Sequence, residues 1–95
     1  MFLGLVRGTV VASERSDELK GAKYLLVEVC TTGGEGTDSF IVTLDVLGAG
    51  EGEMVLVSQG SSARQTAFSK NRAVDAITVG IVDTVYESDN VAYRK

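Results

Sequence analysis

The apolar residues of this chain recur at every second position, and this period constrains the fold more than any other feature. The alternation predicts β-strands at 2–13, 24–30, 40–46, 54–58 and 76–86. The first segment is apolar on both faces and contains Gly4 and Gly8. Glycines inside a strand favour a curved barrel strand with close backbone approach. Its second face must then meet another surface, such as a neighbouring subunit.

The segments between these strands are polar or glycine-rich. Residues 13–20 form a polar excursion closed by Gly21, and 31–39 hold three glycines and nothing apolar, which predicts an exposed loop. Ser62 and Gln65 have capping-box spacing, which predicts a short helix at 63–68. We therefore expect an all-β fold: a small five-stranded Greek-key barrel with one short helix. Residues 1–86 would form this single domain and 87–95 a polar tail.

Composition excludes several classes of function. The 95 residues include no His, no Pro, no Trp and one Cys. Imidazole relays, internal disulfides and His/Cys metal clusters are therefore ruled out, and we expect no cofactor. A monomer of this size buries only roughly 64% of its unfolded surface, so oligomerisation is expected. The net charge of −4 argues against a nucleic-acid partner. No segment is typical of a membrane span or a signal peptide, so the cytosol is the expected location.

The glycine-rich segment 48–53 has the spacing Gly-x-Gly-x-Gly and is followed by a strand pattern. Both features argue against a dinucleotide or P-loop phosphate site, and two glutamates would repel a phosphate. We expect a tight turn that needs positive φ, with Gly50 among the residues that require it. Substitution of Gly50 should then disturb the fold or the assembly.

The remaining candidates for chemistry lack partners in the sequence. Neither Ser61 nor Ser62 has a base to activate it, so helix capping is the plainer interpretation. Cys30 is expected to be a free thiol that behaves as a small hydrophobe, since no basic residue nearby in sequence would make it reactive. Three aspartates, Asp45, Asp75 and Asp83, adjoin strand patterns and could serve acid–base chemistry, although solvated or salt-bridged carboxylates are commoner.

Five motifs, in this order along the chain, resemble the EutN/CcmL family of pentameric vertex proteins of bacterial microcompartment shells. They are Val6-x-Gly8-Thr9-Val10-Val11-Ala12, Leu19-x-Gly21-x-Lys23-x-Leu25-Leu26, Asp45-x-x-Gly48-Ala49-Gly50-x-Gly52-Glu53-x-Val55-Leu56, Gly60-Ser61-Ser62-Ala63-Arg64, and Val74-Asp75-Ala76 with Val79-Gly80-Ile81-Val82-Asp83. The chain departs from the family in having no Pro near Val74. The resemblance covers nearly the whole length of the chain. Family members differ most in the segment 31–39 and in the tail, so the resemblance implies nothing about these two segments.

The resemblance implies an OB-like barrel that assembles as a ring of five and has no enzymatic activity. Such homopentamers cap shell vertices and contact hexameric and trimeric shell proteins, without nucleic acid or membrane. The expected assembly residues are Ser13, Arg15, Gly21, Lys23, Gly48, Ala49, Gly50, Gly52, Glu53, Ser61, Ser62 and Arg64.

Three alternatives remain open. These residues could serve only as turn and capping residues. The barrel could instead be an OB-like module that binds single-stranded nucleic acid. It could also be a small-molecule binder or enzyme that uses the three aspartates with Arg64.

Overall fold

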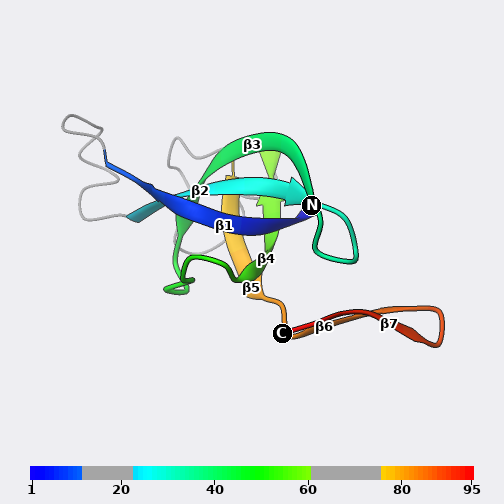
Figure 1. Cartoon of the computed structure of the whole chain (residues 1–95). Coiled ribbons are helices and arrows are strands. Elements are labelled where there is room, and N and C mark those ends of the chain that lie inside the picture. Colours follow the sequence, from blue (N-terminus) through cyan, green and yellow to red (C-terminus); the bar gives the residue numbers. More distant parts are fainter. Residues whose placement is uncertain (12–22, 61–75) are drawn as a thin grey trace.

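The computed structural model describes residues 1–11, 23–60 and 76–95, and the described part is almost entirely β-structure (Figure 1). Its strands are β1 (Phe2–Val10), β2 (Lys23–Cys30), β3 (Gly36–Asp45), β4 (Met54–Gln59), β5 (Ala76–Ile81), β6 (Thr84–Glu87) and β7 (Asn90–Arg94). The first five form a closed barrel in the order β1-β2-β3-β5-β4. The all-β class and the five-stranded barrel are thus confirmed. The helix expected at 63–68 lies outside the described residues.

Strand β1 pairs with β2 on one side and with β4 on the other, antiparallel in both cases. Strands β3 and β5 run parallel, with Leu44 opposite Ile77 and Asp45 opposite Thr78. The register between β1 and β2 shifts between Val6 and Gly8. Such a shift bends a strand and increases its twist, which helps a five-stranded sheet to close.

The barrel interior is filled by one cluster of buried, mostly β-branched side chains. Its members are Val6, Leu25, Val27, Ala49, Val55, Val57 and Ala76. Alternation explains this core, because side chains two residues apart on a strand share a face. A second cluster joins Leu44 to Ile77. A third joins Leu5, Cys30 and Met54 to Val85 and Tyr93 of the last two strands.

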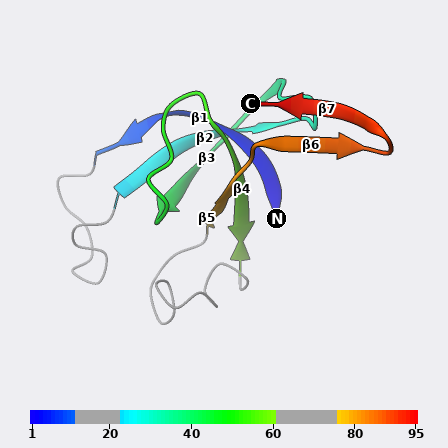
Figure 2. The same cartoon turned by 90° about the horizontal axis from the view of Figure 1, so that it is seen from below.

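Strands β6 and β7 form a separate two-stranded arm, residues 84–94 (Figure 2). The arm extends away from the barrel in both views, and its turn lies at the far end. The prediction of one strand over 76–86 is wrong, because the chain leaves the barrel after Ile81 and pairs with itself from Thr84 onward. The domain boundary expected after residue 86 falls within β6.

The exposed loop expected at 31–39 is also wrong in its second half, because β3 begins at Gly36. The first residues of β3, 36–39, contain no apolar side chain, and polar contacts hold them against β2. The Thr37 hydroxyl donates to the Val29 carbonyl, and the Asp38 N–H donates to the Glu28 carboxylate. Within the described ranges, no helix has both the length and the apolar character needed to cross a membrane.

Candidate functional site

The loop 46–53 connects β3 to β4 and contains most of the described residues that the sequence analysis selected for assembly. It is anchored by the carboxylate of Asp45, the last residue of β3. One carboxylate oxygen accepts from the Leu47 N–H at 3.0 Å and the other from the Ala49 N–H at 3.1 Å. The hydroxyl of Thr78 on β5 donates to the same carboxylate at 3.0 Å. Asp45 is only 8% exposed, so this aspartate is a structural anchor and not a solvated group.

The far end of the loop is joined to β1 by two backbone hydrogen bonds. The Gly52 N–H donates to the Val6 carbonyl at 2.8 Å, and the Val6 N–H donates to the Glu53 carbonyl at 2.9 Å. Gly48 and Gly52 adopt positive φ, 76° and 90°. Gly50 is not among the positive-φ glycines, so the conformational reason expected for it is wrong. Its N–H instead donates to the Glu53 carboxylate.

Glu53 links the loop to the base of the arm. Its second carboxylate oxygen accepts from the Lys95 ammonium at 2.7 Å. The Lys95 ammonium, together with the Gly50 N–H, holds the pKa of Glu53 below its ordinary value. The same contact raises the pKa of Lys95. Both charges are therefore kept over the whole neutral range.

The structure brings together some of the expected assembly residues. Lys23 lies opposite Asp45 in the β2–β3 register and is exposed, as are Gly48, Gly50 and Gly52. Ala49 is different: its side chain packs inside the barrel, because the two Asp45 contacts turn the loop inward at this point. Outside the described residues lie Ser13, Arg15, Gly21, Ser61, Ser62 and Arg64.

A second polar cluster lies on the outside of the barrel. The Arg7 guanidinium donates to the Glu28 carboxylate at 2.8 Å, and the Asp38 N–H donates to its other oxygen at 2.8 Å. The Asp38 N–H, and then Arg7, lower the pKa of Glu28. This cluster lies where the register between β2 and β3 shifts, between Glu28 and Cys30, and it pairs the Glu28 carboxylate with two donors.

The described residues offer little for catalysis. Asp45 is saturated by donors, Asp83 is exposed, and Asp75 lies outside the described residues. Cys30 is a free cysteine, as expected, and it is buried, which raises the pKa of its thiol. Within 1–11, 23–60 and 76–95, no group of three or more Cys, Asp or Glu could hold a metal ion.

The sequence analysis missed the arm. Its root is held by Val85 and Tyr93, which pack against Leu5, Cys30 and Met54 of the barrel. The signal was a short run of apolar residues rich in Val and Tyr on each side of the polar turn at 88–89. It was weak because Ser88, and not Gly, occupies the position with positive φ.

Comparison with known proteins places this geometry in a family. The sequence profile of the family described as ethanolamine utilisation protein EutN/carboxysome matches residues 1–83. The carboxysome shell vertex protein CcmL of Gloeobacter violaceus is 43% identical over 95 residues, which cover 100% of this chain and 95% of the relative. A solved structure of Gloeobacter violaceus CcmL has a TM-score of 0.94 and covers 100% of this chain and 98% of that one.

A second relative is similar over most of the chain. The bacterial microcompartment shell vertex protein GrpN of Rhodospirillum rubrum is 47% identical over 85 residues, 90% of this chain and 96% of the relative. Its solved structure, described as a pentameric microcompartment shell protein, has a TM-score of 0.83 and covers 92% of this chain and 99% of that one. The profile match from the first strand to Asp83, together with these full-length relatives, shows that the chain belongs to the EutN/CcmL family.

Proposed function

We propose that this chain forms a homopentamer that closes the vertices of a bacterial microcompartment shell in the bacterial cytoplasm. The observation that carries the proposal is family membership over residues 1–83, together with 46% identity to the pentameric shell protein GrpN. A flat hexagonal sheet cannot close on itself. A closed shell needs fivefold points, on the order of a dozen, and a cyclic ring of five copies supplies them.

The partners in this proposal are the hexameric and trimeric proteins that tile the rest of the shell. The role is structural and not enzymatic, which is supported by the saturated Asp45 carboxylate and the buried thiol of Cys30. Binding of single-stranded nucleic acid is not favoured, because the chain carries a net charge of −4 and an anionic backbone needs a basic face.

We further assign the loop 46–53 and Lys23 to assembly contacts. The loop is exposed at three glycines, yet Asp45 and Glu53 hold it rigidly on both sides. A rigid, glycine-rich loop lets another backbone approach closely at little entropic cost. The members of the expected set outside the described residues, Ser13, Arg15, Gly21, Ser61, Ser62 and Arg64, remain part of the same proposal.

Two measurements test the main proposal. Native mass spectrometry of the purified chain should show a species of five chains. Electron microscopy of shells made from a hexameric microcompartment shell protein should show closed polyhedra with this chain and open or tubular sheets without it. A chain that stays monomeric at micromolar concentration, or shells that close equally well without it, would refute the vertex role.

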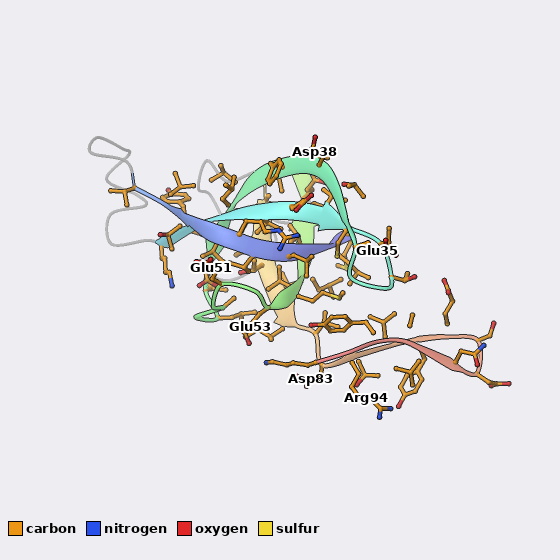
Figure 3. All side chains as sticks on the ribbon, in the orientation of Figure 1. Glu35, Asp38, Glu51, Glu53, Asp83 and Arg94 are labelled. Atoms are coloured by element: carbon orange, nitrogen blue, oxygen red, sulfur yellow. The ribbon has the colours of Figure 1, made fainter. Side chains whose placement is uncertain are left out.

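The loop assignment is tested by a matched pair of charge reversals. Glu51 lies on the loop 46–53, whereas Glu35 lies at the other end of the barrel (Figure 3). Both are exposed, and no described side chain bonds to either carboxylate. Glu51→Lys should weaken either the pentamer or its incorporation into shells, and Glu35→Lys should change neither. Identical behaviour of the two variants would contradict the assignment.

A further inference from the structure

The arm carries an apolar face that the described part of the protomer does not cover. Tyr86 and Val91 lie opposite each other across β6 and β7, and they are 68% and 43% exposed. Val85 and Tyr93, the next pair along the arm, pack on the barrel instead. A two-stranded hairpin alone is marginally stable in water, so an arm that projects this pair needs a surface to pack on.

A second apolar surface lies on the outside of the barrel. It consists of Phe40 and Val42 on β3, Leu26 on β2 and Gly8 on β1, which we call the outer strip. Val42 lies opposite Leu26, and Leu26 lies opposite Gly8, so these three form one row across the strands. Phe40 and Val42 are 49% and 47% exposed.

Gly8 shows that the outer strip is shaped for close approach. Its φ is not in the positive range, so its conformation does not require glycine. A Cβ built on Gly8 would meet no atom within 4 Å in the described part of the chain. Glycine in a strand interior destabilises the fold relative to alanine, so its presence needs a reason. A bare backbone at such a position is typical of a site where another chain comes close.

The two surfaces have the arrangement that a ring requires. A cyclic pentamer uses head-to-tail contacts, in which one patch of each copy meets a different patch of the next. The arm and the outer strip are two such patches on one chain. In Figure 3, Asp38 at the crest of β3 and Arg94 on the arm lie on opposite sides of the barrel.

We propose that the Tyr86–Val91 face of each arm packs across the outer strip of the next copy, with Tyr86 over the bare backbone at Gly8. This inference rests on the proposed function, because it assigns the contact that closes the proposed ring. It makes the ring a chain of arm-to-strip contacts, in which every protomer both donates an arm and receives one.

The decisive experiment is cross-linking of a chain that carries both Tyr86→Cys and Val42→Cys. A short bismaleimide should produce a denaturing-gel ladder that ends at five chains. Each single variant should give no ladder, because the proposed contact joins Tyr86 of one copy to Val42 of the next and a single variant carries a cysteine at only one of these two sites. Tyr86→Cys combined with Val11→Cys is the matched control, since Val11 is strongly exposed but lies outside the strip. A native pentamer without the ladder would overturn the arm-to-strip contact and leave the proposed function standing. A wild-type chain that forms no pentamer would refute both.

A second pair of variants keeps the test independent of cysteine chemistry. Gly8→Val should keep the barrel intact, because the site is open and valine favours strands, yet raise the protomer concentration needed for half assembly about tenfold or more. Gly80→Val, where a Cβ would lie 3.6 Å from the Leu56 Cβ, should assemble as the wild type does. Far-UV circular dichroism confirms that each variant is folded. Equal assembly of the two folded variants would contradict the proposal.

Discussion

Replacing Asp45 by alanine should destabilise the protomer more than any other single carboxylate removal in the loop region. The substitution removes the acceptor of the Leu47 and Ala49 N–H groups and of the Thr78 hydroxyl. The loop 46–53 would then lose its attachment to β5. The expected consequence is a less stable barrel with a mobile loop.

The size of the destabilisation depends on whether each of the three donors can find another hydrogen-bond acceptor. The Ala49 N–H makes a buried bond, and leaving it unpaired costs about 1–3 kcal/mol. The Leu47 N–H is part-buried and can turn to water, which adds about 1 kcal/mol. The Thr78 hydroxyl retains the Leu44 carbonyl at 3.3 Å. The sum is about 2–4 kcal/mol for Asp45→Ala, a large share of the ~5–15 kcal/mol that stabilises a typical protein. Asp45→Asn keeps one acceptor oxygen, and should cost about 1–2 kcal/mol.

Urea unfolding at one fixed protomer concentration measures these differences, because the stability of an oligomer depends on concentration. Glu35→Ala is the control, since it removes an exposed carboxylate outside the loop 46–53 and should change stability by less than about 0.5 kcal/mol. Amide hydrogen exchange at Ala49 should accelerate in Asp45→Ala. If Asp45→Ala unfolds within about 0.5 kcal/mol of the wild type, the anchoring argument is refuted.

Three further predictions follow from other residues. Thr43 is fully buried, and its hydroxyl has no hydrogen-bond partner among the described residues. Thr43→Val should therefore raise the free energy of unfolding by about 1 kcal/mol in urea unfolding. A lower free energy of unfolding in the variant would show that the hydroxyl is bonded. Gly52→Ala should lower the free energy of unfolding by about 1–2 kcal/mol, because Gly52 has a positive φ. Gly50→Ala should lower it by less than about 0.5 kcal/mol, because Gly50 does not. Equal losses in the two variants would contradict this difference in backbone conformation. The pKa of Glu28 is lowered in the folded state, so the stability it contributes above its ordinary value of 4.5 is lost as pH falls through the folded-state pKa. Thermal midpoints between pH 6 and 3 should therefore fall less steeply in Glu28→Gln, and an unchanged slope would refute this.

The barrel was predictable from the sequence because its physical signal is local. Strands β2 and β4 place Leu25, Val27, Val55 and Val57 in the interior at period two, and such alternation needs no knowledge of partners.

The anchor of the loop was not predictable, because its contacts come from distant parts of the chain. Asp45 meets Thr78, a residue 33 positions away, only after the parallel β3–β5 pair has formed. Before that pairing is known, an aspartate at a strand end resembles any solvated carboxylate. The arm was missed for a different reason, since its turn places Ser88 at a φ of 57° where glycine is the usual signal.

The strand order of the barrel also determines when it can close during synthesis. Strands β1, β2 and β3 are sequence neighbours and can pair as soon as they emerge, and β4 then returns to β1. Strand β5 pairs with both β3 and β4, so these two strands keep unpaired edges until Ile81 has left the ribosome. Open edges are templates for mispairing with other chains. Neighbouring nascent chains can therefore aggregate edge to edge until β5 pairs with β3 and β4 in each chain. Strand pairing between residues far apart in the sequence is intrinsically slow, which lengthens this period.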